Sequence, residues 1–320
     1  MAEMDKNDYE YLTLFTGQHS TLIGEHNPDY VIDIEDILHV NRLDCVVKSV
    51  MGVFTKICLS PQSISHVMVQ GDTTTAMAIA LSAFHNGVKV IHLEAGLRTY
   101  DRENPYPEEI NRRVISQIAD IHLCPTVEAE ENLHYEGLSG KFFVVGNTVI
   151  DNLLPYKEKC AYTDKILVTL HRRENHHWMK EWFIELDNLA KQYPEFTFVL
   201  PIHPNPNVQK HRDLLENVVV IDPLPYEKML DFLTKARMVI TDSGGLQEEC
   251  SFLNKKCLVC RKVTERPEAI GQSSFMVDTP EQLSEVFKQH IDDYEINYEC
   301  PFGDGHAAEK IMRVLKNMIK

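Results

Sequence analysis

The chain has 320 residues, of which 43% are hydrophobic and 25% are charged, a composition typical of a folded globular protein rather than a disordered or fibrous one. At about 100–200 residues per domain, this length predicts two domains. The 48 acidic and 32 basic side chains give a formal net charge of −16. That charge argues against nucleic acid as a partner, because affinity for a polyanion depends on many lysine and arginine contacts with phosphates. A single nucleotide needs only a local positive pocket and is not excluded.

No apolar run approaches the roughly 18 residues of a membrane-spanning helix. The first residues lack the basic region and apolar stretch of a signal peptide, so we expect a cytoplasmic protein without a membrane partner. The eight cysteines are spread along the chain, which predicts reduced, mostly buried thiols. Cys257 and Cys260 form a C-x-x-C, but they fall in an apolar, strand-like run and no second pair has zinc-finger spacing. No metal is predicted.

Short apolar runs alternate with amphipathic stretches along almost the whole chain. The expected strands are residues 11–16, 66–69, 89–92, 142–145, 166–170, 196–200, 218–221, 238–241, 257–259 and 274–277. The expected helices are residues 74–85, 108–118, 127–136, 179–191, 226–235, 246–253, 280–290 and 307–318. This alternation predicts an α/β fold with parallel sheets covered by helices on both faces.

The segment 151–164 is the best candidate for a domain boundary, since it separates a turn from the next strong strand. We expect two Rossmann-like lobes, residues 1–160 and 161–320, with an active-site cleft between them. Ligands of such folds bind at domain interfaces and at the carboxyl ends of strands. Polar residues directly after strands therefore carry most of the functional signal.

Two carboxylates follow expected strands in the first half of the chain. Asp72 lies after the strand 66–69, and Glu94 lies after the strand 89–92. Asp72 could simply cap the following helix, and Glu94 could form an ordinary loop ion pair with Arg98. Two acids at neighbouring strand ends are more informative than either alone, because crowding separates their pKa values, as a division into acid and base requires.

The segment 107–113 places two glutamates four residues before two arginines. Such pairs stabilise helices, so a purely structural interpretation is strong. The functional interpretation places Glu108 at the helix N-terminus, facing the same site, with Arg112 one turn further along.

In the second half, positive charge and small residues follow the strands. His171 and Arg172 come after the strand 166–170 and suit an anion, whereas His203 after the strand 196–200 could be an ordinary turn residue. The segment 241–249 runs from a strand through Ser-Gly-Gly into a helix, which points backbone N–H groups at a phosphate. The alternative is a tight strand-to-helix turn. Glu248 or Glu249, one turn into this helix, could accept hydrogen bonds from ribose hydroxyls.

Together and in this order, these motifs resemble the non-hydrolysing UDP-N-acetylglucosamine 2-epimerase family. The resemblance is carried by Thr-Gly-Gln-His (16–19), Gly-Asp-Thr-Thr-Thr (71–75), Glu-Ala-Gly-Leu-Arg (94–98), Pro-Glu-Glu-Ile-Asn-Arg (107–112), Gly-Asn-Thr-Val-Ile-Asp (146–151), His-Arg-Arg-Glu-Asn (171–175), His-Pro-Asn-Pro-Asn (203–207), Thr-Asp-Ser-Gly-Gly-Leu-Gln-Glu-Glu (241–249), Thr-Glu-Arg-Pro-Glu-Ala (264–269) and Pro-Phe-Gly-Asp-Gly (301–305). Ten ordered matches are hard to obtain by chance.

The resemblance implies a glycosyltransferase-B-like fold whose last helix crosses back to the first lobe, and a homodimer. It implies interconversion of UDP-GlcNAc and UDP-ManNAc by anti elimination of UDP to 2-acetamidoglucal and re-addition, without a metal or another cofactor. The catalytic residues it implies are Asp72, Glu94, Glu108 and His171. The substrate-binding residues are Arg98, Arg112, Arg172, His203, Ser243, Gly244, Gly245, Glu249 and Arg266.

One departure from the family concerns its opening strand and Gly-Thr-Arg-Pro-Glu loop, which have no counterpart in this sequence. Two active-site cations would be absent with them. If the loop is truly absent, a UDP-sugar-binding pseudoenzyme or partner subunit is an alternative. Two other enzymes also stay open: a 2-epimerase of a UDP-2-acetamido-2,6-dideoxy-L-hexose, which ranks second because Gly-Asp-Thr-Thr-Thr and Glu-Ala-Gly-Leu-Arg look more like the GlcNAc branch, and a hydrolysing epimerase.

Overall fold

The computed structural model describes residues 1–7, 9–16, 28–32, 42–58, 64–293, 296 and 298–319. The chain divides into two compact units. Unit 1 comprises residues 1–145 and 308–320, and unit 2 comprises residues 146–307. The division between them thus precedes the segment 151–164 in which the sequence suggested a boundary.

Unit 2 is built on a six-stranded parallel sheet with the order β12-β11-β10-β7-β8-β9. Its strands are β7 (Lys165–Thr169), β8 (Thr197–Pro201), β9 (Val219–Ile221), β10 (Met238–Thr241), β11 (Lys256–Val259) and β12 (Ser274–Met276). Its helices are α6 (Thr148–Asp151), α7 (Leu154–Lys157), η2 (Arg173–Asn175), α8 (Met179–Gln192), α9 (Pro206–Gln209), η3 (Arg212–Leu214), α10 (Tyr226–Lys235), α11 (Gly244–Phe252), η4 (Pro267–Ala269), η5 (Pro280–Gln282) and α12 (Leu283–His290).

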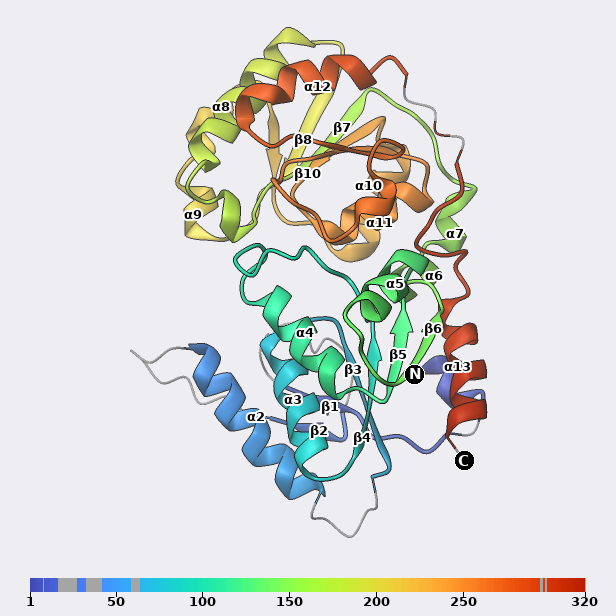
Figure 1. Cartoon of the computed structure of the whole chain (residues 1–320). Helices are drawn as coiled ribbons and strands as arrows, with labels where there is room; N and C mark the ends of the chain where they lie inside the picture. Colours follow the sequence, from blue (N-terminus) through green and yellow to red (C-terminus); the bar gives the residue numbers. More distant parts are fainter. Residues whose placement is uncertain are drawn as a thin grey trace. The chain divides into compact units, whose positions relative to one another are not determined.

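Helices cover both faces of this sheet, with α8 and α12 on one face and α10 and α11 on the other (Figure 1). Strand β7 shows why. Ile166 and Val168 pack in the first core, whereas Leu167 packs in the second, because successive side chains of a strand point to opposite faces. The consecutive apolar residues 166–168 of β7 are therefore buried on both faces of the sheet, as is typical of parallel sheets.

Unit 1 contains a four-stranded parallel sheet with the order β3-β4-β5-β6 and a separate parallel pair, β1 and β2. Its strands are β1 (Leu14–Phe15), β2 (Tyr30–Val31), β3 (His66–Gln70), β4 (Lys89–Leu93), β5 (Ile121–Cys124) and β6 (Lys141–Val144). Its helices are α1 (Ala2–Asp5), α2 (Arg42–Cys58), α3 (Thr74–His85), α4 (Glu108–Ile118), α5 (Val127–Tyr135) and α13 (Ala307–Met318). Helices α2 and α3 contribute to one core of unit 1, and α13, at the end of the chain, packs Ile311 and Leu315 into another core beside β4 and β5 (Figure 1).

The predicted α/β class with parallel sheets is confirmed. Of the elements that the sequence analysis missed, α2 is the longest helix and β5 the longest strand. Helix α2 has a valine-rich sequence that favours strand, yet Val46, Val50, Phe54 and Ile57 are buried at helical spacing. Strand β5 is only four residues long, and His122 interrupts its apolar residues, so the sequence shows no continuous apolar run there. The strand expected at residues 11–16 is limited to β1.

The eight cysteines are free thiols in this structure, Cys257 and Cys260 both fully buried. In the part of the chain that the structure describes, no helix is both long and apolar enough to cross a membrane. The same residues contain no group of three or more histidine, cysteine, aspartate and glutamate side chains placed to hold a metal ion.

Candidate functional site

The carboxyl ends of β3 and β4 in unit 1 present Asp72 and Glu94 next to each other in the sheet order. Gly71 N donates to Leu93 O over 3.0 Å, so the turns that carry the two acids leave the sheet in register. Glu94 has a φ of 62°, an uncommon left-handed conformation for a residue with a side chain. Its Oε1 accepts a hydrogen bond of 2.6 Å from Gln70 Nε2. Strained backbone of this kind clusters at functional sites.

Asp72 is held by the first turns of α4. Arg112 Nη2 donates to Asp72 Oδ2, and Asn111 Nδ2 donates to the Asp72 carbonyl over 2.9 Å. Arg112 is 3% exposed whereas the Asp72 side chain is 28% exposed. A buried guanidinium thus fixes the Asp72 carboxylate while leaving it accessible to solvent. The second carboxylate near Arg112 is Glu109, 3.4 Å from Nη1, rather than the Glu108 expected from the i,i+4 spacing.

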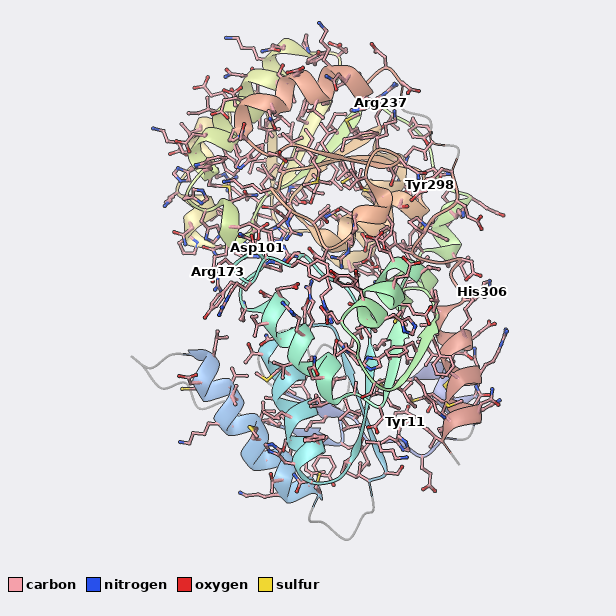
Figure 2. The ribbon with its side chains drawn as sticks, viewed as in Figure 1. Tyr11, Asp101, Arg173, Arg237, Tyr298 and His306 are labelled. Atoms are coloured by element: carbon pink, nitrogen blue, oxygen red, sulfur yellow. The ribbon has the colours of Figure 1, made fainter. Side chains whose placement is uncertain are left out.

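Glu109 is fully buried and organises the loop that precedes α4. Its carboxylate accepts hydrogen bonds from the backbone N–H of Thr99, over 3.0 Å, and of Tyr100, over 3.2 Å. Asp101 on the same loop (Figure 2) accepts hydrogen bonds from Glu103 N and Asn104 Nδ2, both 2.9 Å.

Glu108, the first residue of α4, is half-buried, as are Asp72 and Glu94. The three expected catalytic acids of unit 1 therefore share one property, which is partial exposure.

Arg98 lies deeper in unit 1 and is 4% exposed. Its Nε and Nη2 donate to the two carboxylate oxygens of Glu136 over 2.8 and 2.9 Å, and this bond lowers the pKa of Glu136. Gly96, with a φ of 90°, brings the same loop against α5, where a Cβ atom would lie 2.6 Å from the Ala129 carbonyl carbon. Arg98 and Gly96 thus hold the loop after Glu94 against the body of unit 1.

In unit 2, the carboxyl ends of β7 and β10 meet at Asp242, which is fully buried. Its carboxylate accepts hydrogen bonds from His171 N at 2.9 Å, from Arg172 N at 2.8 Å and from Asn175 Nδ2 at 3.0 Å. The Asn175 side chain also donates to Cys260 O over 2.9 Å. Several donors are what a buried carboxylate needs to offset its lost hydration.

His171 and His203 stand at the same end of this sheet, their rings stacked 5.0 Å apart at 16°. Asn205 N donates to His203 Nδ1 over 3.1 Å, which leaves the proton of a neutral His203 on Nε2. Burial lowers the pKa of His171, and the Asp242 carboxylate opposes that shift.

The turn 243–245 begins α11. Ser243 is the N-cap residue, and its N–H donates to Thr241 Oγ1 over 2.9 Å. At Gly244 a Cβ atom would lie 2.9 Å from Arg266 Cζ, so only glycine lets the arginine approach. The Ser243 side chain and Gly245 are half-buried. The N-terminus of α11 thus offers a partly exposed small-residue turn of the kind that binds anions.

Behind this turn lies a buried network of charges. Arg266 donates from Nε to Glu248 and from Nη1 to Glu265. Arg261 donates from Nη1 to Glu265 over 3.0 Å, and Asn147 Nδ2 donates to Glu248 over 2.6 Å. Every member is at most 8% exposed. The network fixes the first turns of α11 from below.

Glu249 differs from its neighbour Glu248. It is 7% exposed, and its Oε1 accepts a long hydrogen bond of 3.4 Å from the Tyr226 hydroxyl. Burial raises the pKa of Glu249 to about 7, the Tyr226 hydrogen bond opposing the shift. Burial likewise raises the pKa of Tyr226 to about 12. Of the two candidates for a ribose contact, Glu248 is engaged in the network and Glu249 is the one with fewer partners.

Sequence reasoning missed the supporting residues of both units, chiefly Glu109, Asp242 and Asn175. Glu109 stood beside the more conspicuous Glu108, and Asp242 was interpreted only as part of a turn. The position of Asp242 directly after the buried strand β10 could have identified it as a candidate site residue. Gln18 and His19, which carry the first motif, lie outside the described residues.

A family model described as UDP-N-acetylglucosamine 2-epimerase matches residues 2–316. The UDP-N-acetylglucosamine 2-epimerase of Campylobacter jejuni is 37% identical, the match covering 97% of this chain and 91% of the relative. The structure of the Neisseria meningitidis UDP-GlcNAc 2-epimerase bound to UDP-GlcNAc has a TM-score of 0.83 at 35% identity, covering 91% and 86% of the two chains. That of the Methanocaldococcus jannaschii enzyme with UDP-GlcNAc and UDP has a TM-score of 0.83 at 28% identity, covering 99% and 94%.

Proposed function

The chain belongs to the UDP-N-acetylglucosamine 2-epimerase family, and on that premise we propose that it interconverts UDP-GlcNAc and UDP-ManNAc. The observation that carries the proposal is the set of three half-buried carboxylates on unit 1, Asp72, Glu94 and Glu108, with Asp72 held by the buried Arg112. Relatives solved with UDP-GlcNAc support the choice of substrate.

The reaction inverts C2 of the sugar, so a proton leaves one face and another arrives on the opposite face. We infer that a base removes the C2 proton while UDP departs, which gives 2-acetamidoglucal. UDP then adds back, and a proton is delivered to the opposite face of C2. The C2 proton is barely acidic, so its removal requires a positioned base and stabilisation of the departing UDP. Asp72, Glu94 and Glu108 supply three carboxyl groups from which a base and an acid can be drawn. The chemistry needs no hydride and calls on no cofactor.

The UDP part belongs to unit 2 in this proposal. The half-buried Ser243 and Gly245 at the N-terminus of α11 would receive the diphosphate. Arg172, His171 and His203 add donors near the carboxyl ends of β7 and β8. Glu249, with its carboxylate less engaged than that of Glu248, is the expected acceptor for the ribose hydroxyls. Arg112 is expected to act near the sugar through its hold on Asp72.

Arg98 and Arg266 were expected to touch the substrate. That expectation stays a prediction, but the partners of these residues support another role. Arg98 is bidentate on Glu136, and Arg266 pairs with Glu248 and Glu265. We propose that each holds a loop of its unit. The homodimer and the cytoplasmic location also remain predictions.

The test is incubation of the purified protein with UDP-GlcNAc, followed by chromatographic separation of the UDP-sugars. The proposal predicts UDP-ManNAc accumulating to an equilibrium that is also reached from UDP-ManNAc. Release of free ManNAc would instead identify a hydrolysing epimerase. Turnover only of a UDP-2-acetamido-2,6-dideoxy-L-hexose would reassign the substrate. Binding of UDP-GlcNAc by calorimetry without turnover of either sugar would contradict the proposal and leave a binding protein.

A further inference from the structure

The buried carboxylate Asp242 has more contacts than a turn residue requires, and they converge on one segment. It accepts hydrogen bonds from two successive backbone N–H groups, those of His171 and Arg172, and from the Asn175 side chain at the other end of that segment. The carbonyl of His171 is in turn 3.1 Å from His176 Nε2. The backbone on both sides of the His171 side chain is therefore fixed, and Asp242 provides most of the contacts.

Asp242 also acts on the imidazole itself. His171 Nδ1 lies 3.7 Å from Asp242 Oδ1, too far for a hydrogen bond but close enough for an electrostatic interaction between the half-buried imidazole and the buried carboxylate. The other titratable or charged groups that face His171 are Arg172, His176 and His203, and each of them disfavours its protonated form. Among these groups, Asp242 is the one that stabilises the imidazolium.

We propose that Asp242 is the positioning residue of His171, orienting its ring through the backbone and sustaining its ability to carry a proton. This inference rests on the proposed function, which places His171 near the diphosphate, and on the expectation that His171 is a catalytic residue. It assigns Asp242 no contact with substrate. It predicts that removing the charge changes the protonation of His171, and not only the stability of the fold.

The test compares Asp242→Asn, Asp242→Glu and the control Asp187→Asn with the wild type. Asp187 accepts hydrogen bonds from the backbone and side chain of Asn217, 2.6 and 2.8 Å long, and so offers the same kind of contact at the surface of the same unit. The measurements are kcat and KM across pH, together with an NMR titration of the histidine rings in which His171→Gln assigns the His171 signal.

Asp242→Asn is expected to lower kcat by about tenfold or more, up to the roughly 10²–10⁴-fold that loss of a general acid or base costs, with a smaller change in KM. Because the acidic partner is gone, the His171 titration and the matching limb of the pH profile must move to lower pH. Asp242→Glu, which keeps the charge but lengthens the side chain, must keep that limb at its wild-type position while kcat falls. Asp187→Asn must leave kcat, KM and the titration unchanged.

An unchanged His171 titration in a folded Asp242→Asn protein would overturn the inference. If Asp242→Asn does not fold, the kcat of Asp242→Glu decides the question. A kcat equal to that of the wild type in Asp242→Glu would contradict a positioning role for Asp242. The NMR titration needs no turnover, so it separates the two proposals. A wild type without epimerisation fails the proposed function, whereas an active wild type with an unmoved titration fails only the inference about Asp242.

Discussion

The two units treat their carboxylates in opposite ways. Unit 2 buries Asp242, Glu248 and Glu265 and surrounds each with backbone N–H groups, an amide or arginines. Unit 1 leaves Asp72 and Glu94, at the carboxyl ends of neighbouring strands, and Glu108, the first residue of α4, half-buried. A buried charge persists only when it is paired and hydrogen-bonded, so the carboxylates of unit 2 are committed to structure. Those of unit 1 keep the accessibility that proton transfer to a substrate needs.

Each unit contains an exception that clarifies the difference. Glu109 in unit 1 is fully buried and accepts two successive backbone N–H groups, Thr99 and Tyr100, just as Asp242 does in unit 2. Glu249 in unit 2 is buried and accepts a hydrogen bond from the Tyr226 hydroxyl, and burial raises its pKa to about 7. Partners, rather than the unit to which a residue belongs, decide what a carboxylate can do.

The largest expected effect is the loss of kcat on substitution of a unit 1 carboxylate. Asp72→Asn should lower kcat by about 10³-fold, in the range of a lost general acid or base, while UDP affinity measured by calorimetry stays near the wild-type value. Asp120→Asn is the matched control, since Asp120 accepts a hydrogen bond from Val90 N over 2.9 Å in the same unit. Undiminished epimerisation by Asp72→Asn would remove Asp72 from the catalytic set.

The next effect is on stability in unit 2. Glu248→Ala removes the buried acceptor of Arg266 Nε and of Asn147 Nδ2, so the free energy of unfolding should fall by about 3–5 kcal/mol. Glu108→Gln in unit 1 should change it by about 0.5 kcal/mol or less. Urea denaturation of both variants provides the comparison. Equal losses in the two would show that the contrast between the units has no energetic basis.

Binding at the α11 turn is expected to respond to bulk. Ser243→Trp places an indole where the proposal puts the diphosphate, and UDP affinity should fall by about 100-fold, or about 2.7 kcal/mol. The unfolding transition of the same variant, followed by circular dichroism, controls for damage to the fold. Retained UDP affinity in a folded variant would refute the phosphate site at this turn.

A smaller effect is the pH dependence of nucleotide binding through Glu249. Because its pKa is about 7, its carboxyl group is protonated below that pH and cannot accept two ribose hydroxyls. Affinity for UDP-GlcNAc should therefore rise as pH increases, by about tenfold between pH 6 and 8. The measurement uses Asp72→Asn protein to prevent turnover. Adding Glu249→Gln should flatten the profile, and a slope that persists would assign the titration to another group.

The sequence predicted the parts of the structure that depend on local pattern. Alternating apolar and amphipathic stretches were sufficient for the α/β class and for most strands, because a parallel sheet needs continuous apolar runs. Helix α2 was missed because packing against α3 overrides the strand preference of its valines. Residues directly after strands led to Asp72, Glu94 and His171, since chain geometry exposes those positions.

The supporting contacts could not be predicted in the same way. Arg98 pairs with Glu136 across 38 positions of sequence, and Asn147 with Glu248 across 101. The tertiary fold determines which of these residues come together. Sequence spacing alone allows each arginine several acidic partners. The spacing of Glu108 and Arg112 even suggested a pair, yet the arginine instead contacts Asp72 and Glu109.

The most direct test of the central claim, that the carboxylates of unit 1 move protons at C2 while those of unit 2 hold structure and nucleotide, is proton NMR of the protein with UDP-GlcNAc in D2O. The account predicts deuterium at C2 of the UDP-ManNAc formed and of the recovered UDP-GlcNAc, with both exchange and epimerisation slowed by about 10³-fold in Asp72→Asn. UDP-ManNAc that retains protium at C2, or exchange undiminished in Asp72→Asn, would contradict it.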